Sequence, residues 1–216
     1  DGFVNSANNK INSVYTVKGI EGLEDTVKSL TGITIDKYIT IDYDGVRAAV
    51  DAVDGVEVDV PFHMRYRDPY SDPPLNIDIP AGKQVIYGDR AMEFLRFRKT
   101  NYKGYEGYAE GDLGRIKAQQ DFVKAAIKKA ISFKLPKVIS KVYPYTGTDF
   151  SMPEATSLAV SSIGMNSDNV DFHVLPGTTA TKKGLSFYIP NPDEVTAMIY
   201  QIYDIPTDNN EKTEKQ

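Results

Sequence analysis

Hydrophobic residues recur at two different periods along this chain. Between residues 20 and 32 they are spaced by three and four positions, the period of one helix face: Ile20, Leu23, Val27 and Leu30. Between residues 56 and 60, valines alternate with Glu57 and Asp59, which predicts a strand with one buried and one acidic face. Because segments with these two periods alternate along the chain, we expect helices to alternate with strands.

The same reasoning extends over the rest of the sequence. We expect further strands at residues 38–43, 170–174 and 185–189, and a turn at Pro176-Gly177. Further helices are expected at residues 46–53, 88–97, 154–163 and 192–202, the last with Asn191 as its cap. The longest helix begins near Asp112, expected as its N-cap, and runs to Pro136. Residues 61–82, rich in proline, are expected to form a long surface loop with Arg65 and Arg67 in solvent.

This alternation favours an α/β fold, as a three-layer α/β/α domain around a mixed central sheet. With 216 residues the chain is near the size of one domain, so we expect a single domain over residues 1–205. Residues 206–216 are polar and charged and are expected to form a disordered tail.

Composition and charge exclude several classes of function. Cysteine is absent, so disulfides, thiolate metal sites and cysteine nucleophiles are excluded. A net charge of −5 argues against duplex nucleic acid as a partner, because such binders need a broad basic face. The histidines, His63 and His173, have no partner at metal-ligand spacing, so we interpret both as structural.

The arginines are concentrated in one stretch, and this points to local anion binding. Four of seven lie within twenty-six residues: Arg90, Arg96, Arg98 and Arg115. On an extended segment, Arg96 and Arg98 would share one face and Phe97 the other. Arg115 and Gln119, four apart near a helix start, would also share a face. Guanidinium forks match phosphate oxygens, so the pattern favours a pyrophosphate site. The alternative, left open by spacing alone, is a solvated surface of ion pairs.

Two further features allow two interpretations each. Lys10 lies in Asn9-Lys10-Ile11-Asn12, and a single lysine there is more often solvated than functional. Tyr102, Tyr105 and Tyr108 lie in a loop with glycines between them. That loop is either a lid over a ligand or a mobile surface loop.

The sequence resembles the LytR-CpsA-Psr proteins of bacterial cell envelopes. The most specific shared features are Arg-x-Arg at residues 96–98 and Gly-Asp-Leu-Gly-Arg-x-x-x-Gln at residues 111–119. The resemblance covers nearly the whole chain through these segments: Asn9 to Tyr15, Leu30 to Ile33, Tyr38 to Gly45, Val50 to Pro61, Ile79 to Gln84, Gly88 to Lys99, Gly111 to Gln120, Val174 to Gly177 and Tyr188 to Val195.

The resemblance implies a magnesium-assisted phosphotransferase that moves a glycopolymer, such as teichoic acid or capsule, from polyprenyl pyrophosphate to peptidoglycan. It implies a hydrophobic pocket for the polyprenyl chain with arginines at its mouth. Arg96 and Arg98 would be catalytic, and the pyrophosphate would be bound by Lys10, Arg96, Arg98, Arg115 and Gln119. The place of action would be the extracellular face of the cytoplasmic membrane of a Gram-positive-type bacterium, with a membrane anchor.

One departure from the family pattern shapes the expectation for this chain. The family's metal-binding aspartates precede the Lys10-Ile11-Asn12 segment, so the sequence is expected to start part-way into the catalytic domain. We therefore expect no metal ligands here, Mg²⁺ ligands from the missing upstream segment, and an inactive fragment. The alternatives are a non-catalytic polyprenyl-phosphate binding module and, against the acidic charge, a transcriptional regulator.

Overall fold

The computed structural model describes residues 10–131, 135–165, 170–182 and 185–206. Its contacts divide the chain into two compact units, residues 1–36 with 173–216 and residues 37–172. Each unit is described by itself. The prediction of one domain over residues 1–205 stays a prediction, and the predicted tail lies outside the described residues apart from Pro206.

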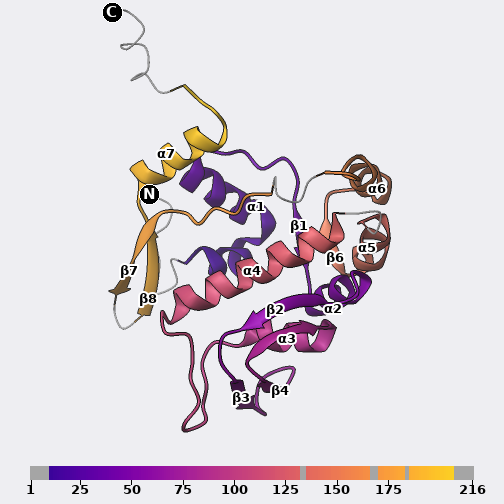
Figure 1. Ribbon diagram of the computed structural model, residues 1–216. Helices are drawn as coiled ribbons and strands as arrows, with labels where there is room; N and C mark the ends of the chain where they lie inside the picture. The colour runs from indigo at the N-terminus through magenta and orange to yellow at the C-terminus, as the bar shows by residue number, and fades with distance from the viewer. Residues whose placement is uncertain (1–9, 132–134, 166–169, 183–184, 207–216) are drawn as a thin grey trace, which may run out of the picture. The chain divides into compact units, whose positions relative to one another are not determined.

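The first unit joins the two ends of the chain. It contains α1 (Ile11–Thr31), β7 (Gly177–Lys182), β8 (Leu185–Pro190) and α7 (Pro192–Ile202), drawn in indigo, orange and yellow in Figure 1. The strands pair antiparallel, from Gly177 opposite Pro190 to Lys182 opposite Leu185. Helix α7 packs against α1 and buries Val195 and Ile199.

Both helices of this unit begin or end where the sequence indicates. The side chain of Asn191 accepts hydrogen bonds from the backbone N–H groups of Asp193 and Glu194, so it caps α7 as predicted. Gly32 ends α1 with φ 75° and donates its N–H to the carbonyl of Lys28. Helix α1 starts at Ile11, earlier than predicted, and it kinks at Gly19, where φ is 69°.

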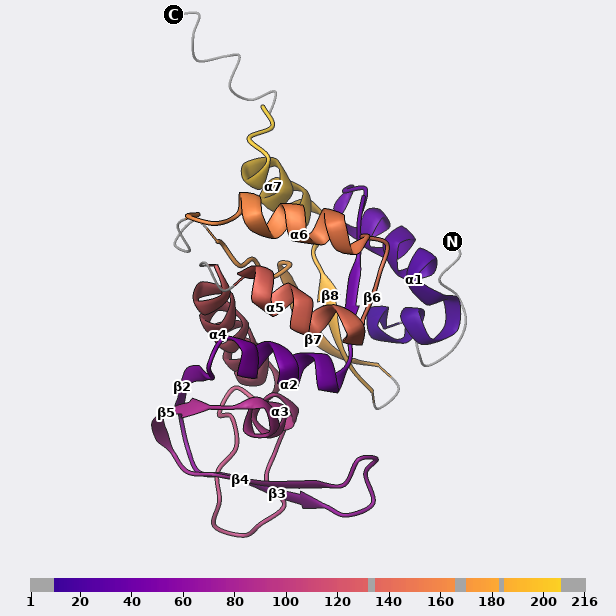
Figure 2. The same ribbon diagram turned by 90° about the vertical axis from the view of Figure 1, so that its right-hand side faces the viewer.

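The second unit contains most of the strands and helices. Its elements are β1 (Ile39–Ile41), α2 (Tyr43–Ala52), β2 (Val56–Val60), β3 (Met64–Asp68), β4 (Leu75–Ile79), β5 (Gly82–Ile86), α3 (Gly88–Arg96), α4 (Asp112–Ala130), α5 (Leu135–Val142), the 3-10 helix η1 (Tyr143–Tyr145), β6 (Thr146–Thr148) and α6 (Met152–Ser161). Figure 2 shows α5 alongside both α2 and α6.

The α/β class is confirmed, but the predicted mixed central sheet is wrong for the described residues. They form separate two-stranded antiparallel pairs: β1 with β6, β2 with β5, β3 with β4, and β7 with β8. Alternating hydrophobicity marks a strand and its buried face, yet it carries no information about which strand lies beside it. In β2 the alternation itself is confirmed, because Val56, Val58 and Val60 are buried while Glu57 and Asp59 are exposed.

Four other predictions are corrected. Residues 61–82 hold the β3–β4 hairpin, whose Met64, Ile77 and Ile79 are buried, because its two short alternating runs flank the proline-rich turn. The expected strand at residues 170–174 has no strand assignment in its described part, and Gly177 begins a strand rather than a turn. The long helix ends at Ala130, and a separate helix starts at Leu135.

A single hydrophobic core holds the second unit together. It gathers residues from α2, β2 to β5, α3, α4 and α5, with Val50, Val56, Phe94, Phe97 and Phe122 among its buried members. Val123 of α4 lies outside this core and is 41% exposed. Among the helices of the described residues, none combines the length and the apolar character that a membrane crossing requires.

Candidate functional site

The Arg-x-Arg motif lies at the end of α3 rather than on a strand. Arg96 is the last residue of the helix, and Phe97 follows it with extended backbone angles, φ −64° and ψ 124°. The expected opposition of side chains is present, because Phe97 is 0% exposed while Arg98 is exposed. The helix predicted at residues 88–97 is confirmed, and the condition for a shared face of Arg96 and Arg98, one extended segment, is not met because Arg96 belongs to the helix.

Arg96 contacts two segments that are far from it in sequence. Its guanidinium carbon lies 5.3 Å from the ring centroid of Tyr43, at the start of α2. Its Nη2 atom lies 3.5 Å from the carbonyl oxygen of Pro73, in the β3–β4 turn. These contacts hold the guanidinium half-buried beside α2, and they are long enough to be exchanged for a stronger anionic partner.

Gln119 joins the second motif to the first. Its side-chain Nε2 donates a hydrogen bond of 2.8 Å to the carbonyl oxygen of Leu95, the residue before Arg96. The carbonyls at a helix C-terminus lack intrahelical partners, so Gln119 satisfies one of them. Gln119 therefore positions the end of α3, and its predicted direct contact with pyrophosphate stays a prediction.

Arg115 lies one turn before Gln119 on the same face of α4, about 6 Å along the helix axis. It is half-buried, and its Nε atom is shielded from solvent. The helix begins after Gly111, which has φ 60° and is the N-cap in place of the predicted Asp112. Arg115 shares the helix face of Gln119, and its charge acts on the Tyr108 hydroxyl.

An aromatic cluster lies beside this arrangement. The ring of Tyr108 is 5.1 Å from that of Phe62 and 6.0 Å from that of Phe97, both in edge-on geometry. Burial raises the pKa of Tyr108 to about 12, an effect that the nearby positive charge of Arg115 partly offsets. The Tyr108 hydroxyl is therefore protonated at neutral pH and available as a donor.

Lys10 belongs to the first unit, whereas Arg96, Arg98, Arg115 and Gln119 belong to the second. Lys10 is the N-cap residue of α1, and its Nζ atom lies 5.0 Å from the ring centroid of Phe187. Its predicted contact with pyrophosphate stays a prediction.

A cavity of about 520 Å³ opens beside α4 and β2. Aromatic rings of Phe62, Phe94, Tyr108 and Phe122 contribute to its lining. Among the described residues that line it there is no arginine. The implied combination of an apolar pocket with arginines at its mouth is therefore not found in this cavity.

Sequence reasoning missed a polar cluster on the β3–β4 hairpin. The Oδ1 atom of Asp78 accepts a 2.6 Å hydrogen bond from His63 Nε2, and its Oδ2 atom lies 3.7 Å from Arg65 Nε. The hydrogen bond from His63, and then the charge of Arg65, lower the pKa of Asp78. Arg65 and Asp78 are directly paired in the antiparallel register, so recognising the hairpin in the sequence would have revealed this pair.

Arg65 also fixes the tyrosine-containing loop. Its Nη1 donates a 2.8 Å hydrogen bond to the Tyr105 hydroxyl, and its guanidinium carbon lies 4.6 Å from the Tyr102 ring centroid. Asn101 adds hydrogen bonds to both the backbone N–H and the carbonyl of Arg67. The prediction of solvation is confirmed for Arg67, which is exposed, and only in part for Arg65, whose side chain is 37% exposed.

The comparisons with known sequences point to one family. The sequence matches the family described as LytR_cpsA_psr family over residues 1–203. It is 28% identical over 188 residues to the polyisoprenyl-teichoic acid–peptidoglycan teichoic acid transferase TagV of Bacillus subtilis, covering 85% of this chain and 46% of TagV. It is 39% identical over 123 residues to the probable cell wall biosynthesis protein LcpB of Corynebacterium glutamicum, covering 57% of this chain and 26% of LcpB. The chain thus spans less than half the length of either relative.

Solved structures show the same fold. The crystal structure of B. subtilis TagV superposes with a TM-score of 0.69 at 25% identity, over 92% of this chain and 76% of that one. Protein gbs0355 from Streptococcus agalactiae superposes with a TM-score of 0.74 at 23% identity, over 96% and 74%. The second likeness, at its lower identity, supports the fold alone.

Proposed function

Because this chain belongs to the LytR_cpsA_psr family, we propose that its protein is a phosphotransferase that moves a cell-wall glycopolymer from polyprenyl pyrophosphate to peptidoglycan. The names of the relatives TagV and LcpB support transfer to, or synthesis of, the cell wall. The contact that carries the site assignment is the hydrogen bond from Gln119 to the Leu95 carbonyl, which draws the two arginine-bearing motifs together.

The proposed chemistry is a phosphoryl transfer. A peptidoglycan hydroxyl oxygen bonds to the phosphorus that carries the polymer, the bond from that phosphorus to polyprenyl phosphate breaks, and polyprenyl phosphate and a proton are released. Arg96 and Arg98 would bind and neutralise the pyrophosphate oxygens, where negative charge develops on the leaving phosphate. Arg115 would add a third guanidinium from α4.

Magnesium stays a prediction of the family resemblance. The described residues contain no group of three or more His, Asp or Glu side chains placed to hold a metal ion. They therefore do not fit a metal site, and no step above passes through magnesium. Action at the extracellular face of the cytoplasmic membrane, with a membrane anchor and inactivity of this chain alone, also belongs to the proposal.

The test is a transfer assay in the full-length protein with Arg98→Ala. We expect loss of at least about a hundredfold in transfer rate, since one charged donor to a developing anion is worth about 10²–10³ in rate. Arg67→Ala is the matched control, because Arg67 is also an exposed arginine but lies on β3. Wild-type rates for the Arg98 variant would refute the site assignment.

A second assay separates catalysis from binding. If full-length protein binds polyprenyl phosphate, seen as a lipid adduct in native mass spectrometry, but turns over no glycopolymer with magnesium present, the protein is a binding module. Arg98→Ala would then weaken the adduct, and Arg67→Ala would leave it unchanged.

A further inference from the structure

We propose that the cavity beside β2 and α4 is a second binding site, for an organic cation with an apolar body. This inference goes beyond the transfer function. It rests on the walls of the cavity, its charge and its place on α4.

The cavity uses a different face of α4 from the arginine motif. Gly114, Lys117, Ala118 and Asp121 line it, whereas Arg115 and Gln119 do not. At about 100° per residue, the cavity residues lie roughly a third of a turn away from the Arg115–Gln119 face. A ligand in the cavity would therefore contact side chains other than those assigned to pyrophosphate.

The walls suit an apolar group with a positive charge. The rings of Phe94 and Phe122 lie 6.0 Å apart at the buried side, and those of Phe62 and Tyr108 lie 5.1 Å apart. Ring faces attract cations, most strongly where water is excluded. The volume of about 520 Å³ lies within the usual range for small-molecule sites.

The charge of the lining excludes an anion. Carboxylates from β2, the loop before α4 and α4 itself contribute to it: Glu57, Asp59, Glu106, Glu110 and Asp121. Lys117 is the one basic residue among the described lining residues. Within the part of the chain that the structure describes, none of the five carboxylates forms an ion pair.

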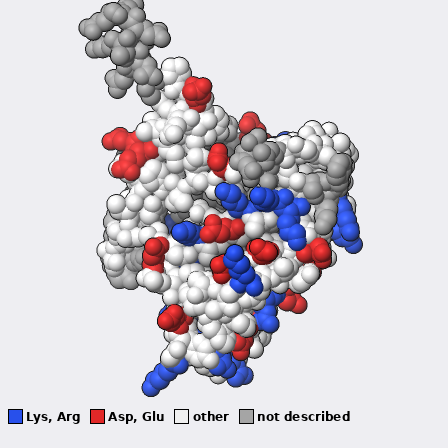
Figure 3. Space-filling model, in the orientation of Figure 1, with Lys and Arg blue, Asp and Glu red and all other residues white. Residues whose placement is uncertain are grey.

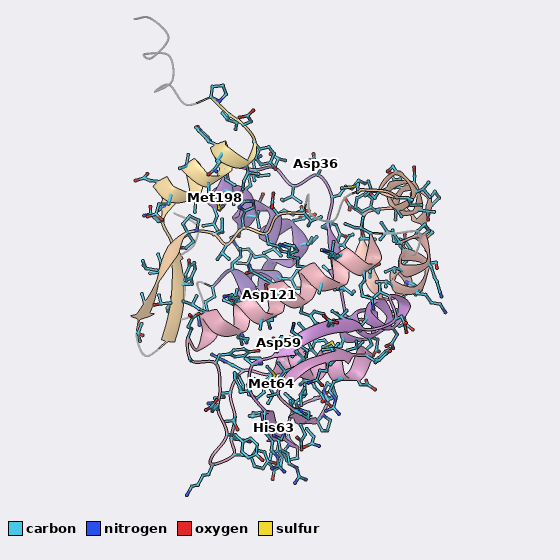
Figure 4. All side chains as sticks on the ribbon, viewed as in Figure 1. Asp36, Asp59, His63, Met64, Asp121 and Met198 are labelled. Carbon is cyan, nitrogen blue, oxygen red and sulfur yellow. The ribbon has the colours of Figure 1, made fainter. Side chains whose placement is uncertain are left out.

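Figure 4 labels Asp59 and Asp121, which approach the cavity from β2 and from α4. On the face displayed in Figure 3, acidic groups lie among basic ones rather than in one uniform field. Preference for a cation must therefore come from the carboxylates that line this cavity rather than from the charge of the whole surface.

The tyrosine-containing loop forms one wall of this site. Residues 106–110 all line the cavity, and the hydrogen bond from Arg65 to Tyr105 fixes the loop immediately before them. Both earlier interpretations of the loop, a lid over a ligand and a mobile surface loop, stay predictions. The loop supplies two of the five carboxylates.

The test compares three eight-carbon probes by isothermal titration: octyltrimethylammonium, 1-octanol and octyl sulfate. We expect the cation to bind about tenfold or more tightly than 1-octanol and octyl sulfate to bind least, because each unpaired carboxylate contributes a modest attraction. Amide shifts at Gly107, Ala109 and Ala118 should locate the bound cation in the cavity. Equal binding of cation and alcohol, or shifts elsewhere, would overturn the proposal.

Charge variants complete the test. Asp59→Asn with Asp121→Asn should weaken octyltrimethylammonium about fivefold and leave 1-octanol unchanged. Asp171→Asn with Asp193→Asn removes two exposed carboxylates elsewhere and should leave both unchanged. If both double variants weaken binding of the cation equally, the effect is due to the net charge of the protein, and the proposed site is refuted. Since the readout is binding, this result is independent of transfer activity.

Discussion

The side-chain amide of Gln119 donates a 2.8 Å hydrogen bond to the carbonyl of Leu95, so a residue of α4 caps the end of α3. The next residue of α3, Arg96, begins the Arg-x-Arg motif. This hydrogen bond links the two motifs that carry the proposed pyrophosphate site. Gln119 therefore has a positioning role, whether or not it also contacts pyrophosphate as predicted.

Gln119→Ala should lower the free energy of unfolding by about 1 kcal/mol, the usual net value of one hydrogen bond. Urea denaturation at neutral pH measures it. Gln120→Ala is the matched control, because Gln120 is the next residue of the same helix and its side chain makes no hydrogen bond with the described residues. Equal losses in the two variants would show that the Leu95 contact contributes nothing of its own.

Tyr105→Phe should loosen the loop that precedes α4 while preserving its ring packing. The variant loses the 2.8 Å hydrogen bond from Arg65 but keeps the edge-on contact with His63, whose ring centroid lies 5.1 Å away. We expect faster amide hydrogen exchange for residues 102–110, by about three- to tenfold, from a loss of about 1 kcal/mol. Tyr70→Phe is the control, because Tyr70 is 96% exposed. Unchanged exchange in the Tyr105 variant would contradict the tether.

The sequence correctly predicted those features that are determined by residues only a few positions apart in the chain. Asn191 marked the start of α7 and Gly32 the end of α1, since capping is decided by the residue beside the helix end. The valine alternation in β2 gave the correct buried face. These features depend on backbone geometry that each short segment specifies alone.

Strand partners and the site geometry depend on contacts between distant residues, and the sequence pattern contains no such information. β1 pairs with β6, from Ile39 opposite Thr148 to Ile41 opposite Thr146, although more than a hundred residues separate them. The shared face of Arg96 and Arg98 required an extended segment, but the predicted helix α3 continues through Arg96. The Arg65–Asp78 pair was missed because prolines in residues 61–82 outweighed the alternation on either side.

The pKa of Asp78 is lowered from its ordinary value of 3.8 by the hydrogen bond with His63 and then by the charge of Arg65. A carboxyl with a depressed pKa stabilises the folded state fully above its unfolded pKa, and this contribution disappears as pH falls through the folded pKa. Asp78→Asn should therefore destabilise the protein at pH 6–7, and this effect should disappear as pH falls through the lowered pKa of Asp78.

Urea denaturation of the Asp78 variant and the wild type across this pH range measures the difference. Asp171→Asn serves as the control, since Asp171 is exposed and its side chain makes no ion pair with the described residues. A difference between wild type and Asp78→Asn that does not vary with pH would assign the effect to packing rather than to the ionised carboxylate.

The start of α6 offers a test in which both partners of a cap are known. Ser151 accepts a hydrogen bond from the N–H of Glu154, and the Glu154 carboxylate accepts 2.7 Å hydrogen bonds from the Ser151 hydroxyl and N–H. These bonds lower the pKa of Glu154.

Ser151→Ala should therefore cost about 1 kcal/mol of unfolding free energy at neutral pH, with a smaller cost as pH falls below the ordinary glutamate pKa and the carboxylate is protonated. Ser157→Ala, at an exposed position within α6, should leave stability unchanged or slightly raised, because alanine is the better helix former. A cost for Ser151→Ala no larger than that for Ser157→Ala would mean that the cap does not stabilise α6.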